Sequence, residues 1–141
     1  MHRSILTFTL IVSAFCFCAD AAIYTVDEGG GGDYFSIREA IEDPIVIDGD
    51  EIIVGPGTYV ENIDFLGKAI TVRSGDITDP ANLTPFPGET VIDGGGAGSV
   101  VMFQSGEGAD SVLQGFTITN GSANWGGVSN VTIHLQLLVI V

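Results

Sequence analysis

A short phrase recurs three times along this chain, and it restricts the folds that the chain can form. In each copy apolar and polar residues alternate and a glycine or an Asn-Gly pair follows; the copies are Ile70–Gly75, Thr90–Gly95 and Phe116–Gly121. The alternation predicts very short strands with one buried face, and the glycines permit sharp turns after them. Short strands separated by turns at a repeated spacing are typical of a solenoid.

Other apolar segments extend this pattern into coils. After a first strand at Ile23–Val26, the sequence predicts two coils of three strands each: Glu51–Val54, Tyr59–Phe65 and Ala69–Arg73, then Glu89–Asp93, Ser99–Gln104 and Ser111–Thr119. The proline-rich segment Gly75–Gly88 between them is expected to be an irregular surface excursion. If each strand pairs with its counterpart in the next coil, the fold is an all-β, right-handed parallel β-helix of about two coils plus a partial third.

A short helix is predicted before the coils. Ser36-Ile37-Arg38-Glu39 fits a capping box, in which the serine and glutamate side chains accept hydrogen bonds from each other's backbone amides. Apolar residues follow at helical spacing and Pro44 ends the helix, so we expect Tyr34–Asp43 to cap the first coil. A β-sandwich is the alternative fold, because it also has short strands and turn signals. The matching coils and the capping helix favour the β-helix.

Residues 1–22 have the pattern of a secretory signal peptide. A weakly basic start is followed by an apolar run from Ile5 to Cys18 and by small residues around Ala21, where we expect cleavage after Ala21 or Ala22. A membrane anchor, a buried helix and a lipoprotein are the alternatives. Both cysteines lie in this segment, so the mature chain has no thiol. The expected location is secreted or at the cell surface, with no membrane span after cleavage.

The charge of the chain restricts its partners. The formal net charge is −14, and the only cations after residue 22 are Arg38, Lys68 and Arg73. Nucleic acids and anionic membranes are therefore unsuitable partners, because they require Lys and Arg to replace counterions. An acidic polysaccharide is repelled as well, unless a cation such as Ca²⁺ bridges it to the chain. The simpler interpretation is that the excess of acidic residues keeps the protein soluble.

Part of the sequence resembles a known group of proteins. The opening resembles that of pectin methylesterases and of many secreted bacterial β-helix proteins of the pectin-lyase-like superfamily, through Gly32-Asp33-Tyr34, Ile37, Ala40-Ile41, Ile53-Val54, Pro56-Gly57-Thr58-Tyr59, Glu61-Asn62 and Ile70-Thr71-Val72. Gly115–Gly121 looks more like the bacterial surface proteins. The resemblance runs from about Ile23 to Trp125 and implies a right-handed parallel β-helix domain over residues 23–127. The esterases carry their catalytic carboxylates and arginine in later coils, and no segment of this chain matches those motifs.

Several charged residues are candidates for catalytic groups. Glu61 follows the Gly57–Val60 turn and strand, and we interpret it as an acceptor for nearby backbone amides, with Tyr59 packing over the turn. A lyase requires a basic side chain, for which Arg73 and Lys68 are the candidates, both expected at strand ends. A glycosidase requires two facing carboxylates, but the spacing singles out no pair among Asp48, Asp50, Asp64, Asp93 and Asp110. We therefore assign no catalytic residue.

Metal and modification motifs are weaker. Asp48-x-Asp50-Glu51 could chelate Ca²⁺ but lacks the remaining ligands of an EF-hand, so a solvated acidic turn is the preferred interpretation. His134 stands alone. We expect no resident cofactor or metal, with Ca²⁺ as the open alternative. Three Asn-X-Ser/Thr sequons, beginning at Asn82, Asn120 and Asn130, are short enough to occur by chance.

The pattern breaks at the C-terminus. Gly126-Gly127 should open another coil with Val131–Ile133 as its first strand, but Leu135–Val141 is apolar at every position except Gln136. Such a stretch leaves an unprotected edge on a solenoid. We interpret residues 128–141 as an aberrant tail that results from truncation or a frameshift in a longer protein. The alternatives are that the tail folds back as a cap or pairs with another chain.

Two functions follow from these observations. The first is a secreted, non-catalytic β-helix segment of a cell-surface or extracellular protein, with a polysaccharide or cell-surface glycan as its partner. The alternative is the N-terminal fragment of a carbohydrate-active enzyme, of the pectin esterase or polysaccharide lyase type, without its catalytic coils.

Overall fold

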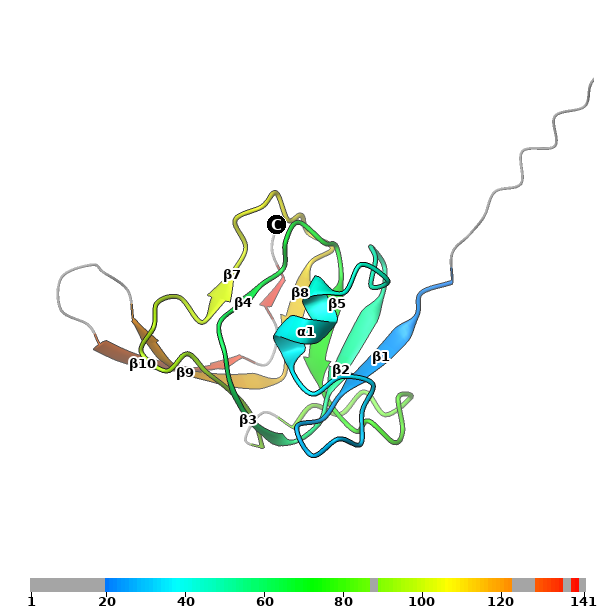
Figure 1. Ribbon diagram of the computed structural model, residues 1–141, viewed down its shortest axis with the longest axis horizontal. Coiled ribbons are helices and arrows are strands. Elements are labelled where there is room, and N and C mark those ends of the chain that lie inside the picture. The colour runs from blue at the N-terminus through cyan, green and yellow to red at the C-terminus, as the bar shows by residue number, and fades with distance from the viewer. Residues whose placement is uncertain (1–19, 87–88, 123–128, 136–137, 140–141) are drawn as a thin grey trace, which may run out of the picture.

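The computed structural model describes residues 20–86, 89–122, 129–135 and 138–139 (Figure 1). Within these residues the chain is mostly strand, with one short helix, so the all-β prediction is confirmed. The predicted signal peptide lies almost wholly outside the described residues. The elements in chain order are β1 (Ile23–Val26), α1 (Ile37–Glu42), β2 (Glu51–Val54), β3 (Gly57–Val60), β4 (Ile63–Asp64), β5 (Thr71–Ser74), β6 (Thr90–Asp93), β7 (Val101–Met102), β8 (Val112–Gln114), β9 (Phe116–Ser122), β10 (Ser129–Leu135) and β11 (Leu138–Val139).

The strands form three sheets, and the chain visits them in turn. The first sheet has the order β1-β2-β5-β8-β11, the second β10-β9-β6-β3 and the third β4-β7. All pairings among β1 to β9 are parallel. One pass of the chain therefore comprises β2, β3 and β4, the next comprises β5, β6 and β7, and β8 and β9 begin a third (Figure 1).

The predicted grouping of strands into coils is wrong in its phase. Ala69–Arg73 was expected to close the first coil, but β5 pairs with β2, with Thr71 opposite Glu51, and so opens the second pass. The expected strands Tyr59–Phe65 and Ser111–Thr119 each contain a corner between two sheets, and Ser99–Gln104 shortens to β7. At Gly115 the corner has a φ of 80°, and a Cβ would collide with Ser74 and Pro85, so only glycine fits there.

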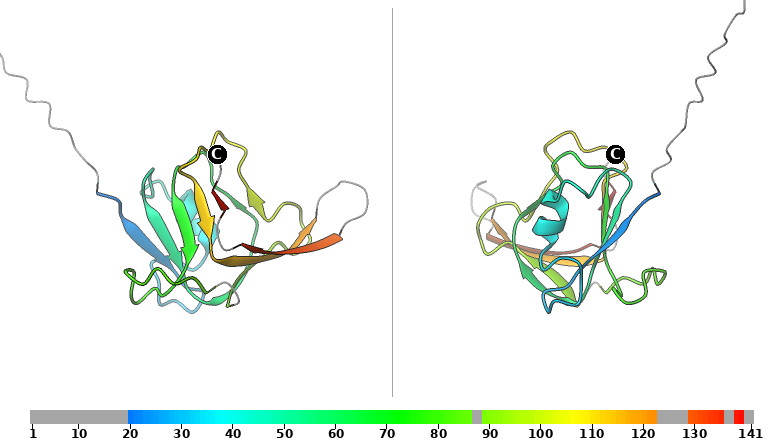
Figure 2. Two further views of the ribbon diagram at one scale, coloured as in Figure 1. Left: turned by 180° about the vertical axis from the view of Figure 1, so that it is seen from behind. Right: turned by 45° about the vertical axis from the view of Figure 1, so that its right-hand side comes forward.

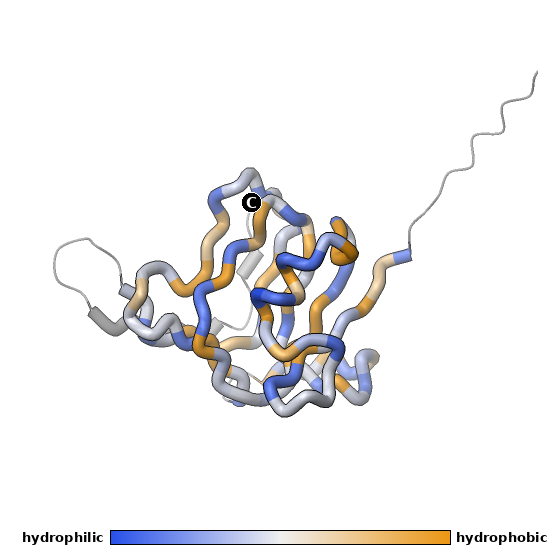
Figure 3. The backbone as a smooth tube through the Cα atoms, viewed as in Figure 1, coloured by the Kyte–Doolittle hydropathy of each residue, from blue (hydrophilic) through white to orange (hydrophobic). Residues whose placement is uncertain are grey.

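Inward side chains of successive passes stack in register to form the core. Two ladders run through it, one of Ile52, Val72 and Leu113 in the first sheet and one of Tyr59, Ile92 and Ile118 in the second. Every member is at least nine-tenths buried. Apolar and polar residues alternate along several of these strands, as expected for strands with one buried face (Figure 3).

The predicted capping helix is present but shorter. α1 buries Ile37, Ala40 and Ile41, and it lies between β1 and β4, against the first strands of the stack (Figures 1 and 2). The Ser36 side chain accepts from the Glu39 amide at 3.1 Å, as the capping box predicts. The Glu39 carboxylate, however, accepts from the Phe35 amide at 3.3 Å and not from that of Ser36. Tyr34 is not helical, because its backbone forms a parallel bridge with Val26.

The outer edge of β1 is closed by local bonds. The Asp33 carboxylate accepts from the Thr25 amide at 2.9 Å and from the Thr25 hydroxyl at 2.8 Å. The Tyr34 amide donates to the Thr25 carbonyl at 3.0 Å. These bonds occupy the outward backbone groups of Thr25, so another strand cannot pair with β1 at this position.

The tail does not start another parallel coil, so that expectation is wrong. β10 runs antiparallel to β9 and β11 runs antiparallel to β8. The chain therefore folds back along the last strands of two sheets, which is the arrangement of the alternative that the tail acts as a cap (Figure 2). Among the described residues, no helix has the length and apolar character needed to cross a bilayer.

Truncating a core side chain should lower the stability considerably, because each ladder residue packs against its neighbours in the adjacent strands. We expect Leu113→Ala to lower the free energy of unfolding by about 2–5 kcal/mol, since Leu113 is fully buried. Val60→Thr, at an exposed strand position, should change it by less than about 0.5 kcal/mol. Urea denaturation of both variants measures the difference, and equal effects would contradict the described core.

Candidate functional site

Several of the charged residues considered from sequence lie around α1 and the first sheet. Glu61 lies between β3 and β4, and its two carboxylate oxygens accept from the Ile37 and Arg38 amides, each at 2.9 Å. These are the first two amides of α1, which lack partners within the helix. The prediction that Glu61 accepts from backbone amides is confirmed, and its carboxylate holds the helix against the stack.

Lys68 binds the other end of α1. Its amine donates to the Asp43 carbonyl at 2.8 Å and to the Ile41 carbonyl. Both are carbonyls at the end of the helix, where a cation also interacts favourably with the helix dipole. Glu61 and Lys68 therefore hold opposite ends of one helix by complementary charges.

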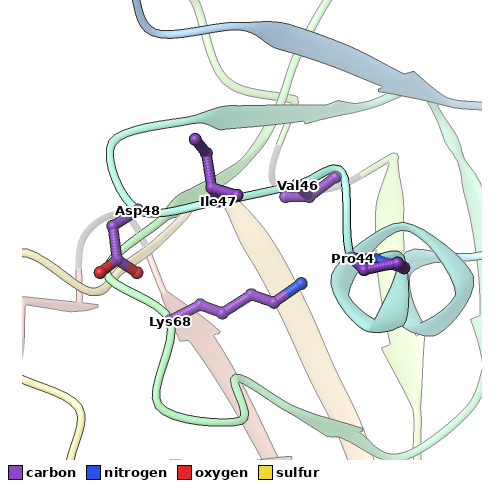
Figure 4. Close-up of a pocket in the computed structure, with 5 residues that line it drawn as sticks. All are labelled: Pro44, Val46, Ile47, Asp48 and Lys68. Carbon is purple, nitrogen blue, oxygen red and sulfur yellow. The ribbon is translucent and has the colours of Figure 1, made fainter. Parts of the chain in front are cut away.

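A shallow pocket of about 440 Å³ lies beside Lys68 (Figure 4). It is lined by Pro44, Val46, Ile47, Asp48 and Lys68. The Asp48 carboxylate accepts from the Ala69 amide at 2.9 Å. Since both charged groups already have backbone partners, what the pocket offers a ligand is mainly apolar surface.

Arg73 is a buried structural residue. It is only 3% exposed, its guanidinium pairs with Glu51, and it donates to the Pro80 and Asn82 carbonyls at 2.8 and 3.3 Å. The expectation that Arg73 sits at a strand end is wrong, because it is the third residue of the four-residue strand β5. Its side chain attaches the irregular segment 75–86 to the first sheet, so it is not exposed to act as a base.

The acidic turn has individual hydrogen-bond partners. The Asp50 carboxylate is almost fully buried and accepts from the Ala22 and Ile47 amides, each at 2.8 Å. Asp48 and Glu51 are bound to Ala69 and Arg73 as described above. Among the described residues, no group of three or more His, Cys, Asp or Glu side chains is arranged to hold a metal ion.

The remaining candidate carboxylates lie at separate turns. Asp64 accepts from the Leu66 amide and the Gln104 side chain, and Asp93 accepts from the Gly95 amide and the Asn120 side chain. Asp110 is exposed. His134 lies in β10, where only the backbone is described.

The hydroxyl partners of two buried tyrosines were not recognised from the sequence. Burial raises the pKa of Tyr34 from 10.0 to about 12, assisted by its hydrogen bond to Asp43 at 3.0 Å. Burial likewise raises the pKa of Tyr59 to about 12, and its hydroxyl donates to the Gly55 carbonyl at 3.2 Å. A tyrosine in an apolar ladder resembles any other core residue in sequence, so nothing local signals that its hydroxyl has a buried partner.

Comparison with known proteins gives one partial match. A stretch of 41 residues is 51% identical to a cell surface glycoprotein of Methanothermus fervidus. The match covers 29% of this chain and 7% of the glycoprotein, so the chain corresponds to a small part of that protein. No protein-family model and no solved structure match the chain.

The bonds from Glu61 to α1 should be measurable. In Glu61→Gln the second acceptor becomes an NH₂ group facing a helix amide, and we expect the free energy of unfolding to fall by about 1–3 kcal/mol. The matched control is Glu42→Gln, an identical change at an exposed position of the same helix, which should cost less than about 0.5 kcal/mol. Urea denaturation that ranks the two variants equally would contradict this role of Glu61.

The buried tyrosines predict a loss of stability in alkali. A pKa raised on folding means that the contribution is complete below about pH 10 and is lost as pH rises towards 12. We expect the free energy of unfolding to fall steeply over that interval. Tyr34→Phe and Tyr59→Phe should each flatten the decline, and a double variant with the wild-type slope would refute the assignment.

Proposed function

We propose that this chain is a segment of a right-handed parallel β-helix in an exported, cell-surface protein, where it acts as a non-catalytic scaffold. The observation that carries the proposal is the structural use of the three cations Arg38, Lys68 and Arg73. Each is bonded to backbone carbonyls of the scaffold. A uronate-processing enzyme requires a basic or cationic group free to meet its substrate.

The β-helix in this proposal is supported by the pairing of the strands. Three sheets with parallel neighbours from successive passes are what stacked coils produce. A connection between parallel neighbours of one sheet is nearly always right-handed, because of the strand twist. The resemblance of the opening to pectin-lyase-like proteins is in line with this handedness.

The cell-surface location is supported by two independent features. Residues 1–22 have the pattern of a signal peptide. The partial match is to a protein named as a cell surface glycoprotein. A neutral glycan is the partner class that we propose, because a net charge of −14 repels acidic polymers.

Export and activity can be tested on one preparation. The full chain, expressed in a bacterial host that has the general secretion pathway, should be found outside the cytoplasm. Its mass should be that of a chain whose first residue is Ala22 or Ile23. Leu10→Asp, which interrupts the apolar run, should keep the chain inside the cell at full length. A full-length chain retained in the cytoplasm of the wild-type culture would contradict the proposal.

The exported product should release neither methanol nor unsaturated uronates from pectin. It should be retained on an insoluble neutral polysaccharide and pass through an acidic one at the same ionic strength. Measurable turnover of pectin would instead favour the carbohydrate-active enzyme fragment. Equal passage through both polysaccharides would refute the glycan partner while leaving the location intact.

A further inference from the structure

The three sequons differ in how the fold presents them. Asn82-Leu83-Thr84 lies in the irregular segment between β5 and β6, Asn120-Gly121-Ser122 lies in β9, and Asn130-Val131-Thr132 lies in β10. A sequon is modified on the Nδ2 atom of its asparagine, so an acceptor site needs that atom and the hydroxyl residue to be accessible.

The Asn82 sequon is held at the surface by a buried residue. Arg73 donates to the Asn82 carbonyl at 3.3 Å and to the Pro80 carbonyl at 2.8 Å, and the Asn82 amide donates to the Asp79 carbonyl at 2.9 Å. At the same time, Leu83 is 70% exposed and Thr84 is exposed. The backbone of the segment is thus attached to the first sheet, with Asn82 half-buried and the two residues after it facing solvent.

The side chain of Asn82 uses its oxygen and leaves its nitrogen available. Its Oδ1 accepts from the Thr84 amide at 3.1 Å, which forms an Asx turn across the sequon. Among the described residues, the hydrogen bonds of Asn82 include no acceptor for Nδ2.

The Asn120 sequon has the opposite arrangement. Its Nδ2 donates to the Asp93 carboxylate at 2.9 Å, and the Ser122 hydroxyl donates to the Gly96 carbonyl at 2.9 Å. Asn120 also has a left-handed φ of 54° within β9. Both functional groups of this sequon therefore hold the scaffold together. Asn130 lies in a strand paired with β9, where only the backbone is described.

We propose that Asn82 is an acceptor site for N-linked glycosylation. The donor is a sugar carried on a polyisoprenyl phosphate or diphosphate, delivered by a membrane oligosaccharyltransferase. The anomeric carbon of the sugar bonds to Nδ2 of Asn82, its bond to the phosphate oxygen breaks, and the proton lost from Nδ2 leaves with the lipid phosphate. This inference rests on the export proposed above, because such donors serve exported chains.

Pro85 modifies the expected extent of the reaction. A residue before proline is confined to extended backbone, so Thr84 cannot adjust freely to the transferase. We therefore expect partial occupancy of Asn82 in the wild-type chain and higher occupancy in Pro85→Ala.

The test is expression of the full chain in an archaeal host that performs asparagine-linked glycosylation, followed by glycopeptide mass spectrometry of the exported protein. Glycan should be found on the Asn82 peptide, disappear in Asn82→Gln and Thr84→Ala, persist in Thr84→Ser, and be unchanged in the control Val60→Thr, at an exposed position outside every sequon. An exported chain with unmodified Asn82 in both the wild type and Pro85→Ala would overturn the proposal. So would occupancy of Asn120 equal to that of Asn82.

Failure of export can be separated from failure of the site. The purified, folded chain is incubated with an oligosaccharyltransferase and its lipid-linked donor, which removes the requirement for secretion. Modification of Asn82 in this reaction supports the site even if the chain remains inside the expressing cells, in which case only the proposed location fails. The absence of modification under conditions that label a control peptide with the same sequon overturns the site itself.

Discussion

Every interior strand of this chain depends on backbone partners that the next pass supplies. A strand of four residues such as β2 has no stability alone, and its amides and carbonyls are satisfied only by β1 on one side and β5 on the other. The same constraint leaves the outward backbone groups of the first strands without a neighbouring strand. α1 covers the adjoining apolar residues, and Asp33 occupies the outward amide of Thr25. β1 and α1 therefore close one end of the sheets, and the later strands pair on the other side of β1 and its neighbours.

Several charged side chains of this chain form hydrogen bonds and an ion pair that stabilise the fold. Glu61 and Lys68 bind the two ends of α1, and the pair of Arg73 and Glu51 secures the outer face of the first sheet. Lys68 and Arg73 each donate to two backbone carbonyls and Arg38 donates twice to that of Asn62, and such bonds from charged donors are stronger than neutral ones. The acidic excess is spread over separate turns, where carboxylates accept from nearby amides. Many of the acidic residues therefore stabilise turns, in addition to giving the chain a net charge that repels acidic partners.

Local structure could be predicted from the sequence, whereas the phase of the coils could not. β1 and β2 begin and end where the sequence predicts, and the capping box placed Ser36 correctly because its partner is only three residues away. The alternation, however, is the same in every sheet, so it does not tell which strand follows a corner. The corners depend on contacts such as that of Gly115 with Ser74, which are 41 residues apart. For the same reason Glu61 was recognised as an acceptor, but its donors in α1 were not.

The closed end of the stack also gives the fold a direction. Within the described residues, β1 and α1 precede the strands that stack on them, so each later strand can pair with one that is synthesised before it. Asp33 keeps β1 from pairing with another strand on its outer side, so further parallel strands join only on the side of β2. Insertion of further parallel strands between β9 and the antiparallel β10 in evolution would therefore leave the contacts of α1 and β1 unchanged.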